Sequence, residues 1–262
     1  MKIGISTLAF VKRSFDESVE AIKAHDNIKC WEIIDDSRFR LDKERARILS
    51  DVSSSMDVEY SVHAPLSDIN VATLDPKLRT TYLEIFKFSL EMAQLIDAKT
   101  WVFHPGWLTP YTIFFPDEAW RANLELIREL ANLAEELEVG LAVENLFAKY
   151  ALITKLDDMR RLFDELKNEK VGFCLDVGHA NIVGVDSVLD YITEFHNQLV
   201  HVHAHDNDGK GDSHSVIGEG SVHWPQIMGR LREINYDGMI IIESFSFKEA
   251  LLSHYNMQNM LG

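Results

Sequence analysis

Residues 199–220, LVHVHAHDNDGKGDSHSVIGEG, concentrate histidine and aspartate side chains that can bind a metal ion or move a proton. His201, His203 and His205 alternate along an apolar run, so in a β-strand they would share one face. We predict that His203 is the metal-binding residue of the three. His201 is expected to lie deeper, as a packed residue or a support for another ligand. His205 is expected at the rim, as a substrate contact or a surface residue.

The loop that follows this run is rich in glycine, aspartate and asparagine, and it is expected to cross the site. It supplies Asp212 and His214 as two further potential ligands. A solvated loop without any ligand role is the alternative interpretation.

Ligand-type side chains also stand at the ends of six consecutive apolar runs. They are His63, His104, Glu144, Asp176 with His179 three residues later, His203 and Glu243. A lone histidine in such a place is usually a packed, hydrogen-bonded residue, and a lone acid often caps a helix. Six runs in succession that all end in a ligand-type residue are difficult to attribute to chance, so we predict a shared metal site.

The types of these residues indicate which metal and which chemistry to expect. Histidine and carboxylate together suit zinc, manganese or a similar divalent ion, and such an ion can polarise a carbonyl or activate water. The only cysteines, Cys30 and Cys174, lie inside apolar runs, so we expect buried free thiols rather than a cysteine-based zinc site.

Short β-rich runs alternate with longer helical patterns along the whole chain. The predicted strands cover residues 2–8, 29–35, 58–64, 99–105, 140–145, 171–176, 199–205 and 238–244. Helices are predicted at 76–96 and 117–138, with Pro76 near the first start and Gly140 as the stop of the second.

This alternation predicts a parallel sheet with crossover helices. Eight strand–helix units in 262 residues match a single (β/α)8 TIM barrel domain spanning residues 1–262, since such barrels typically have ~250 residues. An open doubly wound sheet is the alternative, but the segment STLAFVKRS after the first strand lacks the glycine-rich loop of that fold. In a barrel, the strand ends meet at one mouth, which would bring the predicted ligands together.

The charge of the chain limits its partners. A formal net charge of −16 disfavours broad contact with nucleic acid or an anionic membrane, although Lys12, Arg13, Arg38 and Arg40 could form a local basic group. No apolar run approaches the ~20 residues of a membrane span, and no signal peptide is evident, so we expect a cytoplasmic protein.

The loop at residues 105–116, PGWLTPYTIFFP, is unusually aromatic. It carries Trp107, Tyr111, Phe114 and Phe115 beside the end of the fourth predicted strand. A lid that excludes water from the mouth is one interpretation, and a contact in a homodimer or simple packing are the others.

At these positions the sequence resembles the xylose-isomerase-like TIM-barrel superfamily. That group contains sugar isomerases and epimerases as well as DNA-repair enzymes of the endonuclease IV class. The resemblance extends over essentially the whole chain. Its motifs are VHAPLSDINVA (62–72), FHPG (103–106), VEN (143–145), CLDVGH (174–179), HAHDNDG (203–209), DSHSVIGEG (212–220) and IIES (241–244).

The isomerase and epimerase branch implies one divalent metal ion with four protein ligands. The matching residues here are Glu144, Asp176, His203 and Glu243. The two glutamates would also act as acid and base on opposite faces of a small carbohydrate, moving a proton through an enediolate that the metal stabilises. Residues that would bind substrate or further metal are His63, His104, His179 and His214. His214 stands where several ketose epimerases carry arginine, which speaks against a ketohexose substrate.

The endonuclease IV branch implies three zinc ions with nine ligands. All nine have matches here: His63, His104, Glu144, Asp176, His179, His203, Asp212, His214 and Glu243. Such an enzyme hydrolyses a phosphodiester at an apurinic or apyrimidinic site, so nucleic acid would be the partner. That branch also inserts side chains into the duplex, and only Phe39 and Leu66 are candidates for this role here.

We therefore predict a divalent-metal-dependent isomerase or epimerase of a small sugar, polyol-derived or sugar-phosphate substrate, with one zinc or manganese ion. A zinc-dependent apurinic endonuclease with three zinc ions is the alternative. A barrel that keeps its metal site only for structure or binding is a third possibility.

Overall fold

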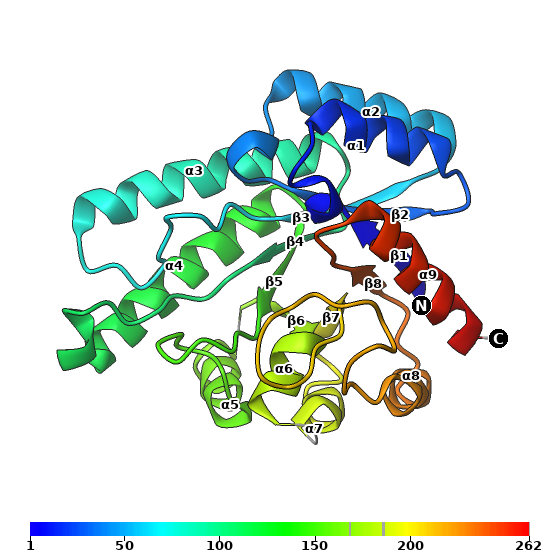
Figure 1. Cartoon of the computed structure of the whole chain (residues 1–262). Helices are drawn as coiled ribbons and strands as arrows, with labels where there is room; N and C mark the ends of the chain where they lie inside the picture. Colours follow the sequence, from blue (N-terminus) through cyan, green and yellow to red (C-terminus); the bar gives the residue numbers. More distant parts are fainter. Residues whose placement is uncertain (168, 185–186, 262) are drawn as a thin grey trace.

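The computed structural model describes residues 1–167, 169–184 and 187–261. Its eight described strands pair in parallel and in chain order, and β8 pairs with β1, so the sheet closes into a barrel (Figure 1). The strands are β1 (Lys2–Ser6), β2 (Cys30–Ile34), β3 (Glu59–His63), β4 (Thr100–Phe103), β5 (Gly140–Glu144), β6 (Gly172–Asp176), β7 (Leu199–Ala204) and β8 (Met239–Ile242). The predicted (β/α)8 TIM barrel is therefore confirmed, and the open-sheet alternative is wrong.

The helices lie outside the strands and cover the barrel (Figure 1). Those in the described residues are α1 (Phe15–Ala24), α2 (Lys43–Met56), α3 (Pro76–Leu95), α4 (Pro116–Glu136), α5 (Leu156–Glu165), α6 (Val177–Val183), α7 (Ser187–Glu194), α8 (Trp224–Glu233) and α9 (Phe247–Leu261). The main core lies between helices and strands, where residues such as Trp31, Trp101 and Leu126 are fully buried. Among the described residues, no helix is both long enough and apolar enough to cross a membrane.

The end of α4 differs from the sequence prediction. The helix ends at Glu136, and Glu138 adopts the left-handed backbone conformation (φ 56°) that was expected of a glycine. Gly140 instead opens β5, where an added Cβ would lie 2.6 Å from the carbonyl oxygen of Lys99. Gly140 is therefore required for close approach to β4, and it does not stop the helix.

The strand register determines which side chains point into the barrel. Glu32 pairs with Ser61, His63 with Val102, and Asp176 with His203. Because side chains alternate along a strand, these residues and every second neighbour face inward. Small apolar clusters that include Cys30 and Cys174 belong to the same inward set, and both thiols are free and buried as predicted.

The buried imidazole of His254, on α9, gives a testable pH dependence far from the mouth. Burial lowers the pKa of His254, although a hydrogen bond to the backbone of Ile3 opposes this. Its contribution to stability is therefore complete above the unfolded-state pKa of about 6.5 and is lost as pH falls through the folded-state pKa. We expect the His254→Asn variant to lose less unfolding free energy than wild type on acidification, measured by urea denaturation. His196→Asn, at an exposed histidine, is the control and should behave as wild type.

Candidate functional site

Four side chains from four neighbouring strands meet at the carboxyl mouth of the barrel. The ring atom Nδ1 of His203 lies 3.3 Å from Oε2 of Glu144, 3.9 Å from Oδ2 of Asp176 and 3.8 Å from Oε1 of Glu243. All four residues are buried. The strand register explains this convergence. Glu144, Asp176 and His203 are inward-facing residues near the carboxyl ends of β5, β6 and β7, and Glu243 follows β8 on the same inward face.

Two further imidazoles, which follow or end β3 and β4, approach the same carboxylate oxygen of Glu144. Nε2 of His63 lies 3.5 Å and Nε2 of His104 lies 3.3 Å from Oε2 of Glu144. Nδ1 of His63 is 2.9 Å from the carbonyl oxygen of Ala64, to which it donates. That hydrogen bond leaves Nε2 of His63 as the ring atom that faces the carboxylate.

A third group forms where the loop after β7 folds over the mouth (yellow to orange in Figure 1). Nε2 of His214 lies 3.3 Å and Nε2 of His179 lies 3.6 Å from Oδ2 of Asp212. The structure thus brings together all nine sequence-predicted site residues: His63, His104, Glu144, Asp176, His179, His203, Asp212, His214 and Glu243.

The prediction that His205 lies at the rim is wrong. Its side chain is fully buried, with Nε2 3.2 Å from Oδ1 of Asp176 and 3.5 Å from Oδ1 of Asp212, and its ring stacks on His214. The inward register of β7 continues past the end of the strand, and the loop that carries Asp212 covers it. His205 therefore belongs to the same cluster.

Asn145 is a residue that sequence reasoning quoted in a motif without giving it a role. Its side chain donates to the carbonyl oxygen of Asp176 and accepts from the amide of Asp176, at 3.0 and 2.9 Å. Its own carbonyl accepts from Nδ1 of His179 at 2.9 Å. Asn145 therefore fixes the end of β6 and the orientation of His179, and the buried asparagine at the end of a predicted strand was the available signal.

Opposite charges within the cluster shift several pKa values. Burial alone would raise the pKa of Glu144, but the charges of His104 and His203 hold it well below its usual range. Burial opposes protonation of His63, yet the adjacent negative carboxylate of Glu144 raises the pKa of His63 to about 9. Protonated imidazoles thus compensate the negative charge of the buried carboxylates. A divalent cation bound at the same place would compensate this charge in their stead.

The donor set fits a divalent metal ion. Within the described part of the chain, several buried site atoms have no hydrogen-bond partner: Oε2 of Glu144, Oδ2 of Asp176, Nδ1 of His203, Oδ1 of Asp212 and Nδ1 of His214. Buried polar atoms are normally satisfied, so unpaired oxygens and nitrogens that face one another indicate a place for a cation. Ligand atoms of Asp176, His203 and Glu243 lie within 4.8 Å of one another, as do those of His63, Glu144 and His203. Mixed nitrogen and oxygen donors suit zinc or manganese.

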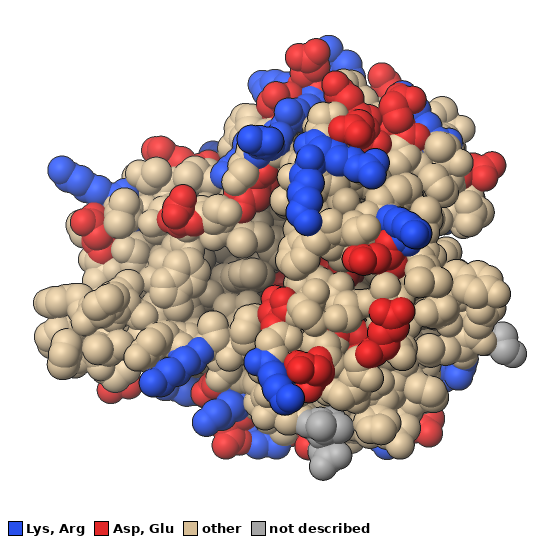
Figure 2. Space-filling view, in the orientation of Figure 1, with Lys and Arg blue, Asp and Glu red and all other residues tan. Residues whose placement is uncertain are grey.

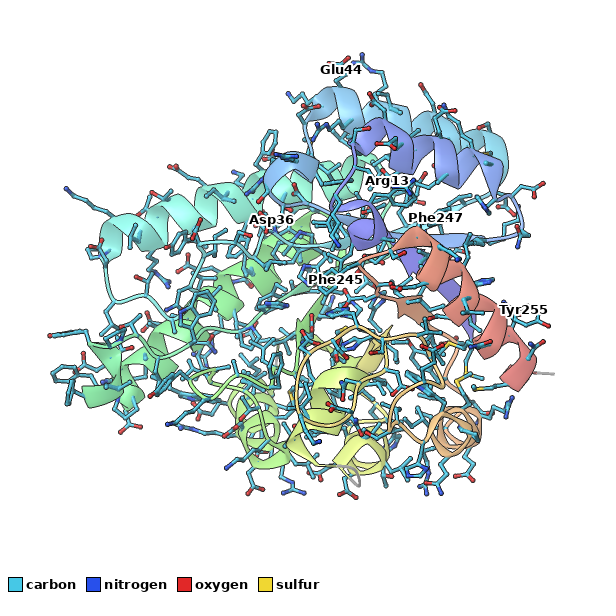
Figure 3. The ribbon with its side chains drawn as sticks, viewed as in Figure 1. Arg13, Asp36, Glu44, Phe245, Phe247 and Tyr255 are labelled. Atoms are coloured by element: carbon cyan, nitrogen blue, oxygen red, sulfur yellow. The ribbon has the colours of Figure 1, made fainter. Side chains whose placement is uncertain are left out.

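A cavity of about 460 Å³ opens above this cluster. Its wall includes Glu144, Glu243 and Leu66, together with Asp36 after β2 and Phe245 after β8, which are labelled in Figure 3. This face of the molecule is hollowed, with acidic side chains near the hollow (Figure 2). The volume is typical of a site for a small molecule.

The aromatic loop at 105–116 does not line this cavity among the described residues. Tyr111 and Phe114 are exposed, with relative exposures of 66% and 73%, and Ile113 and Phe115 are exposed beside them. The structure therefore does not support an aromatic lid over the substrate, and the alternative of a contact with a second chain remains a prediction.

The fold and the cluster together define a (β/α)8 barrel with a candidate His/carboxylate metal centre at its mouth. The chain belongs to the xylose isomerase-like TIM barrel family, whose sequence profile matches residues 19–258.

The relatives of this chain include sugar 3-epimerases and a probable endonuclease. The chain is 31% identical over 258 residues to the protein MJ1311 of Methanocaldococcus jannaschii, covering 97% of this chain and 87% of that protein. It is 29% identical over 189 residues to a D-psicose 3-epimerase of Enterocloster bolteae, covering 70% of this chain and 60% of the epimerase. It is 27% identical over 181 residues to a probable endonuclease 4 of Mycobacterium leprae, covering 66% and 68%. The crystal structure of a D-tagatose 3-epimerase-like protein superposes with a TM-score of 0.93 at 29% identity, covering 100% of this chain and 97% of that one.

Proposed function

We propose that this protein is a divalent-metal-dependent epimerase or isomerase of a small carbohydrate. The observation that carries the proposal is the pair Glu144 and Glu243, which both line the cavity and both approach His203. Two carboxylates at one small-molecule cavity provide an acid and a base for moving a proton on a carbon next to a carbonyl. The sugar 3-epimerases among the relatives support this reaction class.

Each residue of the centre has a proposed role. Glu144, Asp176, His203 and Glu243 would hold the metal ion, which when bound would polarise the carbonyl and hydroxyl of a substrate and so acidify the adjacent C–H bond. Glu144 and Glu243 would take up and return the proton. His63, His104, His179 and His214 surround the cavity and would donate hydrogen bonds to substrate oxygens.

The exposed ring of Phe245 gives a prediction about substrate binding. It lines the cavity, and its centroid lies 4.6 Å from that of His214. The apolar C–H face of a sugar would pack on such a ring, so we expect Phe245→Ala to raise KM roughly 2–12-fold, from a contact worth about 0.5–1.5 kcal/mol. Initial rates over a range of substrate concentrations measure this, with kcat little changed. Phe114→Ala, an exposed aromatic outside the cavity, is the matched control.

The experiment that tests the proposed centre is elemental analysis of protein purified without a histidine tag or chelator. One metal ion per chain would agree with the epimerase proposal. A chain that holds no divalent metal under any loading condition would refute it.

An apurinic endonuclease is the second candidate, and one observation favours it. Asp212 and His214 form a further possible ligand group with His205, beyond the first four residues, and His179 also approaches Asp212, as a centre with more than one zinc ion would require. Phe39, however, is only 4% exposed and lines the cavity, so it is not placed to enter a DNA duplex. Three zinc ions per chain with salt-sensitive binding to an abasic duplex would support this candidate. Absence of binding at low salt would exclude it.

A further inference from the structure

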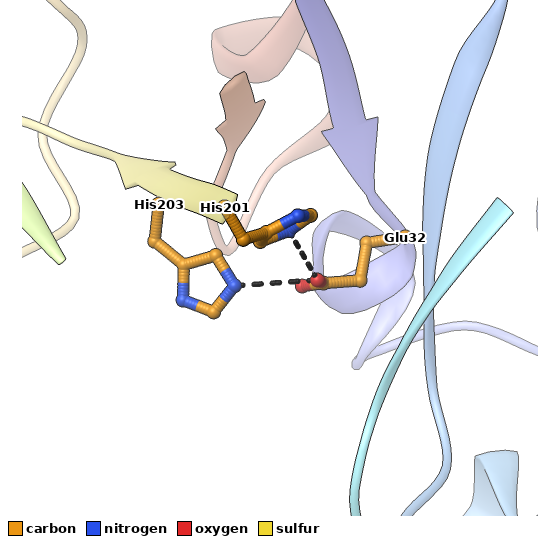
Figure 4. A group of neighbouring side chains, drawn as sticks. All are labelled: Glu32, His201 and His203. Carbon is orange, nitrogen blue, oxygen red and sulfur yellow. Dashed lines mark hydrogen bonds and ion pairs between the residues drawn. The ribbon is translucent and has the colours of Figure 1, made fainter. Parts of the chain in front are cut away.

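Below the candidate metal centre lies a buried carboxylate that sequence reasoning did not single out. Glu32, on β2, is fully buried in the barrel interior, where its register partner is Ser61. Its Oε2 lies 3.0 Å from Nε2 of His201, 3.2 Å from Nε2 of His203 and 3.1 Å from Oγ of Ser61. Figure 4 shows both imidazoles of β7 directed at this carboxylate.

The hydrogen bond to Glu32 determines which ring nitrogen of His203 carries the proton. A carboxylate oxygen only accepts hydrogen bonds, so Nε2 of His203 carries the proton and donates it to Glu32. Nδ1, on the other side of the ring, is then the atom that can offer a lone pair. Nδ1 is also the atom that faces Glu144, Asp176 and Glu243.

His201 and Ser61 hold the carboxylate in turn. Both donate to Oε2 of Glu32, the oxygen to which His203 also donates. Both are fully buried, so solvent water does not compete for these hydrogen bonds. A second metal ion bound by Glu32, His201 and His203 is the competing interpretation of this cluster. The hydrogen bonds oppose it, because each would have to be broken to free a ligand atom.

We propose that Glu32 is a positioning residue that orients His203 and fixes its Nε2–H tautomer, so that Nδ1 is presented to the metal ion. Hydrogen-bond partners of this kind behind a metal-binding histidine typically contribute 10- to 100-fold to metal affinity. This inference rests on the proposed metal centre but not on the identity of the substrate.

Zinc affinity of purified variants, measured by competition with a chromophoric chelator, tests the inference. We expect Glu32→Met, which has no acceptor oxygen, to weaken zinc binding about 10- to 100-fold, and Glu32→Gln, which keeps one oxygen, to weaken it less. The visible spectrum of the cobalt-loaded variants should also change, because the ring of His203 is no longer held. The matched control is Asp35→Asn, since Asp35 is another buried acid, next to β2, that accepts from the amide of Leu41. Asp35→Asn should alter stability alone.

The outcomes separate this inference from the proposed function. Zinc affinity within twofold of wild type in both Glu32 variants would overturn the positioning role while leaving the metal centre intact. Wild-type protein that binds no zinc would overturn both. Nitrogen-15 NMR of the histidine rings in zinc-loaded wild type needs no folded Glu32 variant. In this spectrum we expect His203 to be the Nε2–H tautomer. An Nδ1–H tautomer of His203 would contradict the proposed role of Glu32.

Discussion

Replacing Glu144 by glutamine is expected to lower kcat by about 10³- to 10⁴-fold, at the upper end of the range for loss of a general acid or base. The amide keeps the shape of the side chain but cannot accept a proton at neutral pH. It is also a weaker ligand for a divalent metal ion. Glu144 is buried among His63, His104 and His203, so bulk water cannot readily act as the acid or base in place of its carboxylate.

The measurement for this variant is the rate of epimerisation at saturating substrate, together with circular dichroism to establish that the fold persists. Glu136→Gln is the control, because Glu136 is an exposed acid on α4, and it should retain wild-type activity. Activity of Glu144→Gln within tenfold of wild type would show that Glu144 is not the acid or base.

Removal of the metal ion is expected to cause the second large effect. A ligand present at a thousandfold above its Kd stabilises the folded state by about 4 kcal/mol. For a chain of this size, each kcal/mol shifts Tm by about 2–4 °C, so dialysis against a chelator should lower Tm by roughly 8–16 °C. Differential scanning calorimetry before and after readdition of zinc or manganese measures the shift.

A variant of the metal centre controls for effects of the chelator itself. Asp176→Asn removes the charge of a fully buried residue that is a proposed metal ligand, and the Tm of this variant should barely respond to added metal. Wild-type Tm that is the same with and without chelator would argue that these residues form a hydrogen-bonded cluster without a metal ion.

The barrel and most of the cluster were predictable because they depend on local patterns. Strand-length apolar runs end in ligand-type residues, and parallel strands of a closed barrel carry those ends to one mouth. This pattern predicts that Glu144, Asp176 and His203 lie close together. They do so because the barrel register keeps all three on the inward face.

Residues whose environment depends on distant segments were not predictable in the same way. His205 was expected at the rim because it follows a strand, yet residues of the next loop, including Asp212, cover it. Glu32 is a single acid within an apolar run, and only the closure of the barrel places it beside His201 and His203. Gly140 was interpreted as a helix stop because the close approach of Lys99 cannot be seen in the sequence.

The most direct test of the central claim is proton exchange with solvent. Metal-loaded protein is incubated in D2O with a panel of ketopentoses, ketohexoses and their phosphates, and proton NMR follows the hydrogens next to each carbonyl. The proposed function predicts that at least one sugar loses such a signal with wild type and keeps it with Glu144→Gln. Retention of every such proton, alongside cleavage of an abasic duplex by the same preparation, would contradict the proposal.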